Sequence, residues 1–127
     1  MKSTHSIQGM TLIELMIALA IVAIIAAIAL PSYQAQIVSS NRNEAKTALV
    51  QLKLQQENYR LDNSSYASTT NFGNPTLDNY TVSFDNISST TFTLKATVKV
   101  GNSQQNDTGC TELSIDQSMN TSPATCW

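Results

Sequence analysis

The sequence predicts an α+β fold in which one long N-terminal helix packs along a small antiparallel β-sheet. Three observations predict this fold. Side chains without polar atoms fill residues 15–30, a helix-like pattern free of Gly and Pro covers residues 32–62, and short alternating segments begin near residue 80. A chain of 127 residues has room for one small domain.

The apolar run is long enough to enter a membrane. Together with residues 10–14 it reaches the roughly twenty residues that a helix needs to cross a bilayer. Glu14 is the only charged residue between Met10 and Asn41, and it lies near one end of the run, where a charge costs less. A buried core helix is disfavoured, because so short a chain cannot cover a helix that is apolar on every face.

The helix is expected to continue beyond Pro31 with an amphipathic pattern. Apolar side chains recur at steps of three and four residues at Tyr33, Ile37, Ala45, Ala48, Leu49, Leu52 and Tyr59. We therefore predict one helix over residues 10–61, on the order of 75 Å long. Its apolar half would protrude, and its second half would pack on the sheet. Pro31 lacks an N–H group, which predicts a kink there.

The head is expected to hold three or four antiparallel strands. Residues 65–78 predict a connecting loop, residues 85–89 a hairpin and residues 101–109 a polar turn. A third strand is expected at residues 110–115. The side chains predicted to face the helix are Tyr80, Val82 and Phe84 in the first strand, and Phe92, Leu94, Ala96, Val98 and Val100 in the second.

The chain contains two cysteines, Cys110 and Cys126. With an N-terminus of the kind found in exported proteins, such a pair indicates an oxidising compartment and one disulfide. Closing the loop between them would stabilise the fold by roughly 3 kcal/mol. The alternative is two unpaired cysteines that pack as small apolar side chains. A zinc or redox site is disfavoured, because there is no C-x-x-C motif and no nearby histidine.

Composition and charge argue against an enzyme or a nucleic-acid-binding protein. The formal net charge is −2, and the chain after Leu61 contains two basic and six acidic residues. His5 is the single histidine, and no Gly-rich phosphate loop or metal cluster occurs, so we expect no catalytic residue, cofactor or metal. Asp107, Glu112 and Asp116 lack a recognisable calcium-binding spacing.

The N-terminal segment resembles a known processing site. Residues 8–16 read QGMTLIELM, which is similar to the cleavage site of type IV prepilins. The resemblance implies that a prepilin peptidase cuts between Gly9 and Met10 and methylates the new amine of Met10. Residues 1–9 would be the leader, residues 10–31 the transmembrane and filament-core helix, and residues 32–127 the periplasmic or extracellular head. Met10 departs from the usual phenylalanine.

A conventional signal peptide is the alternative for this segment. Ala27, Ile28 and Ala29 match a small-x-small cleavage pattern after an apolar stretch. Glu14 would then sit inside or beside the apolar region of that signal, and Lys2 would be almost the only base before it. Both features disfavour the alternative.

The resemblance also implies a role for Glu14, which would lie in the apolar interior of a filament. There it would pair with the methylated amine of Met10 on a neighbouring subunit and set the stagger between subunits, with Thr11 of the same motif also serving assembly. A snorkelling acid without a partner is the alternative. Type IV pilins bend at a proline such as Pro31.

The short head and the ending Cys126–Trp127 resemble PilE-type minor pilins. The expected function is that of a structural subunit, of the minor class, in a type IV pilus that supports twitching motility, adhesion or DNA uptake. Its partners would be other pilins and the prepilin peptidase. It would lie in the inner membrane before assembly and in the extracellular pilus afterwards. The alternatives are a type II secretion pseudopilin and a pilus-associated DNA-uptake receptor, although we expect no direct nucleic acid binding.

Overall fold

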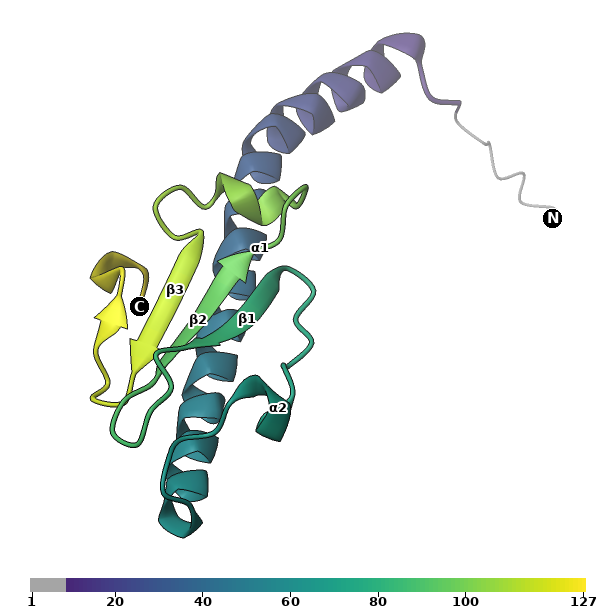
Figure 1. Cartoon of the computed structure of the whole chain (residues 1–127). Helices are drawn as coiled ribbons and strands as arrows, with labels where there is room; N and C mark the ends of the chain where they lie inside the picture. The colour runs from purple at the N-terminus through teal and green to yellow at the C-terminus, as the bar shows by residue number, and fades with distance from the viewer. Residues whose placement is uncertain (1–8) are drawn as a thin grey trace, which may run out of the picture. The chain divides into compact units, whose positions relative to one another are not determined.

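The computed structural model describes residues 9–127, and residues 1–8 of the expected leader lie outside this range (Figure 1). The described chain falls into two compact units, one ending at Gln36 and the other running from Ile37 to Trp127. A single helix assignment, α1, covers Leu12–Asp62. The predicted long helix is therefore confirmed within two residues at its start and one at its end. It contains Pro31, and the predicted kink stays a prediction.

The C-terminal part of α1 packs on the sheet through one stripe of side chains. Ala45, Leu49 and Leu52 are buried at the spacing of successive helical turns, as the pattern predicts. The same stripe buries Gln56 and Lys53, which the pattern did not place there. The Nζ of Lys53 forms an ion pair with Glu57 Oε1 at 3.2 Å, one turn later.

Two expected packing residues of the helix are exposed instead. Tyr33 is 67% exposed and Ile37 is 39% exposed. The first buried residue of α1 is Ala45. The apolar side chains of the helix before Ala45 are therefore not buried by the sheet. Helical periodicity alone does not reveal where along the helix the sheet begins.

The sheet is a four-stranded antiparallel meander in the order β1-β2-β3-β4 (Figure 1). Its strands are β1 (Tyr80–Asp85), β2 (Thr93–Val98), β3 (Glu112–Asp116) and β4 (Thr121–Ser122). Val82 lies opposite Ala96, and Ala96 lies opposite Leu113. All three are buried, as expected when alternate residues of each strand share one face. The predicted α+β fold is confirmed.

The second strand ends earlier than its apolar pattern predicts. Val98 pairs with Tyr80, the first residue of β1, whereas Val100 is 94% exposed. The prediction that Val100 faces the core is wrong, because β2 ends at Val98 and the last backbone bond toward the β1 side is from Lys99 N to Asn79 O at 3.0 Å. Gly101 then adopts a φ of 83°, a conformation that favours glycine, and the chain turns away.

The connections contain short helical turns that the sequence did not predict. The connecting loop after α1 holds the four-residue helix α2 (Thr69–Phe72), and the polar turn holds the 3-10 helix η1 (Ser103–Asn106). The loop before α2 is fastened to α1 by Gln56, whose amide accepts from Ala67 N at 2.8 Å and donates to Ala67 O at 2.7 Å. A second 3-10 helix, η2 (Ala124–Cys126), precedes Trp127.

The turn between β3 and β4 is organised by the carboxylate of Asp116. It accepts hydrogen bonds from the backbone N–H groups of Ser118 at 2.8 Å and Asn120 at 2.9 Å, and from the Asn120 side chain at 2.7 Å. Partial burial raises the pKa of this carboxyl, but the bonds from Asn120 and Ser118 outweigh burial and lower it overall. The charged form of Asp116 therefore holds the turn.

Candidate functional site

The first 19 residues of α1 present an apolar surface on every side. Between Leu12 and Leu30 the large apolar side chains are 48–77% exposed. The most apolar 18-residue window of the helix has a mean hydropathy of 2.9, and none of that window is buried. Water disfavours so much contiguous apolar area. Such a surface calls for an apolar environment, and the helix is long enough to cross a bilayer.

Thr11 and Glu14 form a capping box at the start of α1. Glu14 Oε2 accepts hydrogen bonds from Thr11 N at 2.9 Å and Thr11 Oγ1 at 3.0 Å, while Glu14 N donates to Thr11 Oγ1 at 3.3 Å. The spacing of the two residues thus has a local structural use that the sequence reasoning missed. Within residues 9–127 the second carboxylate oxygen, Oε1, accepts no hydrogen bond.

Gly9 and Met10 lie just before the helix and are exposed. A Cβ atom added at Gly9 would meet nothing within 4 Å, and its backbone is not in the left-handed region that favours glycine. The fold of the described chain therefore places no demand on glycine here.

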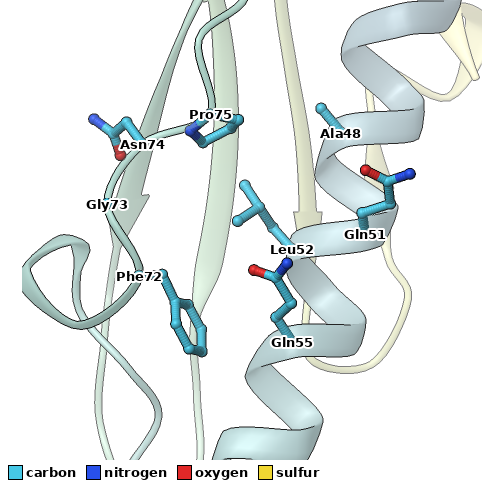
Figure 2. Close-up of a pocket in the computed structure, with 8 residues that line it drawn as sticks. All are labelled: Ala48, Gln51, Leu52, Gln55, Phe72, Gly73, Asn74 and Pro75. Atoms are coloured by element: carbon cyan, nitrogen blue, oxygen red, sulfur yellow. The ribbon is translucent and has the colours of Figure 1, made fainter.

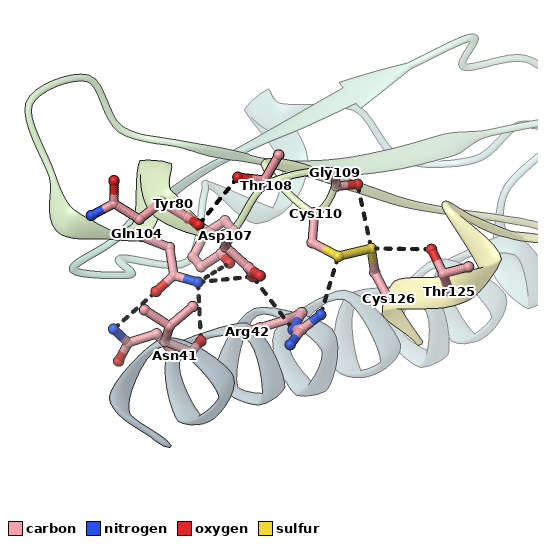
Figure 3. A network of polar contacts seen from close by, with 12 residues as sticks. Asn41, Arg42, Tyr80, Gln104, Asp107, Thr108, Gly109, Cys110, Thr125 and Cys126 are labelled. Atoms are coloured by element: carbon pink, nitrogen blue, oxygen red, sulfur yellow. Dashed lines mark hydrogen bonds and ion pairs between the residues drawn. A yellow bond between two sulfur atoms is a disulfide. The ribbon is translucent and has the colours of Figure 1, made fainter. Parts of the chain in front are cut away.

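The head is fastened to α1 by the buried side chain of Gln104 (Figure 3). Its Nε2 lies within hydrogen-bond distance of Val38 O at 3.0 Å, Tyr80 Oη at 2.9 Å and Asp107 Oδ2 at 3.2 Å. Its Oε1 accepts from Asn41 Nδ2 at 3.1 Å. Gln104 has no exposed surface. The amide therefore joins η1, β1 and α1 in one buried network.

Tyr80 joins this network through its hydroxyl, which bonds Gln104, and it is 2% exposed. Burial raises the pKa of its hydroxyl, the hydrogen bond from Gln104 lowers it, the Asp107 charge raises it and the Arg42 charge lowers it, with a net rise. The hydroxyl therefore stays neutral at physiological pH and acts as a hydrogen-bonding group. Nothing in its surroundings activates it as an acid or base.

The C-terminal disulfide lies beside this network. Cys110 and Cys126 are bonded and buried, which agrees with the expected pairing. Arg42 reaches the disulfide from α1: its Nη1 donates to Cys110 Sγ at 3.1 Å, and its Nε lies 3.4 Å from Asp107 Oδ2 (Figure 3). Trp127 packs partly against the core, and its Nε1 donates to Ser122 O at 3.3 Å.

A small open cavity of about 200 Å³ lies between α1 and the loop after α2 (Figure 2). Its lining residues are Ala48, Gln51, Leu52, Gln55, Phe72, Gly73, Asn74 and Pro75. None of these side chains is ionisable, so the cavity offers no general base, nucleophile or charged metal ligand. No cluster of three or more potential metal-ligating side chains occurs within residues 9–127 either.

Half of the basic side chains in the head are neutralised by acids. Lys95 Nζ lies 3.4 Å from Asp85 and 3.9 Å from Glu112 on the outer face of the sheet, and Arg42 and Lys53 have the acidic partners described above. Among the described residues, the bases without an acidic partner are Lys46, Arg60 and Lys99. They come from separate parts of the chain, so the head has few cations available for a polyanion.

Two family models match the chain. The model described as type IV minor pilin ComP, DNA uptake sequence receptor, matches residues 31–114. The model of the prokaryotic N-terminal methylation motif matches residues 4–30, which include Gly9, Met10 and Glu14. The two matched ranges adjoin at residues 30 and 31. None of the curated proteins compared with the chain matches it.

A solved type IV pilin has a similar fold. The high-resolution structure of a type IV pilin from Shewanella oneidensis is 25% identical to the chain, covers 71% of it and 97% of its own length, and superposes with a TM-score of 0.58. This likeness and the matched minor-pilin family agree with the resemblance found in the sequence. The chain belongs to the ComP family of type IV minor pilins.

Proposed function

We propose that the chain is a minor pilus subunit that is stored in the inner membrane and assembles into the filament by packing of residues 10–31. The observation that carries this proposal is the apolar surface of α1 between Leu12 and Leu30, which is exposed on every side. In the membrane that surface is covered by lipid. In the filament it is covered by the equivalent helices of neighbouring subunits.

Processing prepares the helix for both states. We infer cleavage between Gly9 and Met10, followed by methylation of the Met10 amine. The match to the methylation motif supports this inference, as does a glycine at position 9 that the described fold does not require. The new amine, on Met10, is a cation four residues before Glu14. The apolar segment stays on the mature protein.

In the filament, Glu14 then forms an ion pair with a terminal amine. A lone carboxylate among apolar helices is costly unless it is paired. Its Oε2 is already held by Thr11, so its orientation is set before a partner arrives. Its Oε1 is available for the amine of Met10 on the neighbouring subunit, and a pair at one depth would align successive subunits along the filament axis.

The intact mass of the protein isolated from membranes and from sheared pili tests this proposal. We expect a product that begins at N-methyl-Met10 in both fractions. Gly9→Leu should leave the leader attached and keep the chain out of pili, because the bulky side chain blocks the peptidase while the described fold tolerates it. Gln8→Leu is the matched control beside it. A mature product that begins at Leu30, or a freely soluble periplasmic head, would refute the proposal.

A second candidate function is direct reception of DNA. The observation that favours it is the family description, which names a DNA uptake sequence receptor. The head charges oppose it, since only Lys46, Arg60 and Lys99 lack an acidic partner among residues 9–127. Three phosphate contacts would give a slope of log affinity against log salt of about −3 at most. The uptake role that we favour is therefore support of a DNA-importing pilus, without direct capture.

Titration of the mature full-length chain in detergent micelles with labelled duplex DNA separates the two roles. We expect no binding above that of a chain with Lys46, Arg60 and Lys99 replaced by glutamine. Tight binding to one sequence over its scrambled version, with a shallow salt slope, would establish a receptor that reads bases. A slope far steeper than about −3 would show that the ion pairs of the head open on DNA.

A further inference from the structure

We propose that Cys110 is the attacking thiol when the C-terminal disulfide is formed, because Arg42 stabilises its thiolate. Only the thiolate of a cysteine is nucleophilic, and a nearby cation favours it. Arg42 Nη1 lies 3.1 Å from Cys110 Sγ. Within residues 9–127 no basic side chain lies within hydrogen-bond distance of Cys126 Sγ, whose neighbours are Gly109 O at 3.4 Å and Thr125 Oγ1 at 3.8 Å. The two sulfurs therefore have different surroundings.

Bonds other than the disulfide also hold Cys110 in place. Its N–H donates to Asp107 O at 2.9 Å, and Asp107 N donates to Gln104 O at 3.0 Å. Gln104 is in turn anchored to α1 through Asn41 and Val38 (Figure 3). These bonds hold the turn that carries Cys110 against the helix that carries Arg42. The contact between Arg42 and Cys110 should therefore exist in the reduced, folded chain.

Cys126 has a weaker hold on the fold. It lies in η2, after the two-residue strand β4, which pairs with β3 only through Ser122 and Thr121. In a reduced chain this tail would be joined to the sheet by a short ladder and by the packing of Trp127 on the core, whereas Cys110 would be held by a network around a fully buried amide. In the reduced chain Cys126 is accordingly the more mobile thiol, and Cys110 is the thiol with a fixed position.

The ionisable groups that face Cys110 act in opposite directions. Arg42 stabilises a negative sulfur, whereas Asp107, which lies 3.4 Å from Arg42 Nε, offsets part of that charge. Tyr80 is neutral and bonds to Gln104. Because the two charges have opposite effects on the Cys110 thiolate, we expect removal of the Arg42 charge to slow the reaction of Cys110 and removal of the Asp107 charge to speed it.

The reaction has two thiol–disulfide exchanges. The Cys110 thiolate attacks a sulfur of an external disulfide, the S–S bond of that oxidant breaks, and one oxidant thiolate leaves. Cys126 then loses its proton to solvent and attacks Cys110 Sγ, and the second oxidant thiolate leaves. The chain loses two electrons and two protons, and the oxidant disulfide is reduced to two thiols. A disulfide-bearing thiol oxidase of the exporting compartment would be the natural oxidant.

Oxidised glutathione is a suitable probe for the mature full-length chain in detergent. Cys126→Ser leaves Cys110 to form the mixed disulfide, and Cys110→Ser leaves Cys126. We expect the Cys126→Ser chain to react about tenfold faster at pH 7 and to reach its half-maximal rate at a lower pH, because its thiolate is stabilised. In guanidinium chloride the two chains should react at equal rates.

Charge variants in the Cys126→Ser background separate this role from a structural one. Arg42→Gln should remove most of the rate advantage, Arg42→Lys should keep part of it, and Asp107→Asn should increase it. Arg60→Gln is the matched control, since Arg60 bonds the carbonyls of Ser89 and Asn63 away from the cysteines. Circular dichroism of each reduced chain checks that it is folded. Equal native rates for the two single-cysteine chains, or no effect of Arg42→Gln in a folded chain, would overturn the proposal.

Discussion

Replacing Glu14 by leucine should remove the chain from pili almost completely while leaving its amount in the inner membrane unchanged. Leucine suits lipid better than a carboxylate does, so membrane storage does not suffer. In the filament, however, the methylated amine of a neighbour would be buried without an anion. Breaking a buried pair by removing one partner costs about 3–5 kcal/mol. Quantitative mass spectrometry of sheared pili and of membranes measures both pools.

Two variants control this experiment. Glu44→Leu makes the same replacement at an exposed acid of α1 that has no ion pair among the described residues, and it should leave the pilus content unchanged. Glu14→Asp keeps the charge on a shorter side chain and should restore part of the incorporation. Processing between Gly9 and Met10 should be complete in every variant. Normal pilus content of the Glu14→Leu chain would refute the pairing with a neighbouring amine.

Replacing Gln104 by alanine should lower the free energy of unfolding of the head by about 3 kcal/mol. The change removes a fully buried amide and leaves Asn41 Nδ2 and Val38 O without the partners that it supplied. Each buried polar group that loses its partner costs about 1–3 kcal/mol, and the cavity adds to this. Urea unfolding of the full-length chain, followed by the fluorescence of its single tryptophan, Trp127, measures the loss.

The neighbouring glutamine is the matched control. Gln105 is exposed, and its side chain makes no hydrogen bond within residues 9–127. Gln105→Ala should therefore change the free energy of unfolding by no more than about 0.5 kcal/mol. If the two variants unfold at the same urea concentration, the amide of Gln104 does not hold the head to α1.

The main features of this protein follow from local sequence patterns. The apolar run, the amphipathic continuation of the helix and the alternation in β1 to β3 are periodic signals, and each reports which face of an element is covered. They predicted the long helix, the buried sheet face and the α+β fold. The motif around Gly9 and Glu14 is also local, because the match to the methylation motif and the bonds that begin α1 both depend on neighbouring residues.

The anchoring of the head was decided by the tertiary structure alone. Nothing in the sequence distinguishes Gln104 from Gln105, or Arg42 from the other bases of α1. Their roles come from the residues that the fold brings near them, 63 positions away for Asn41 and Gln104 and 68 for Arg42 and Cys110. The exposure of Val100 and Tyr33 has the same origin. A periodic pattern states which way a side chain faces, but only the folded chain decides whether anything lies there to cover it.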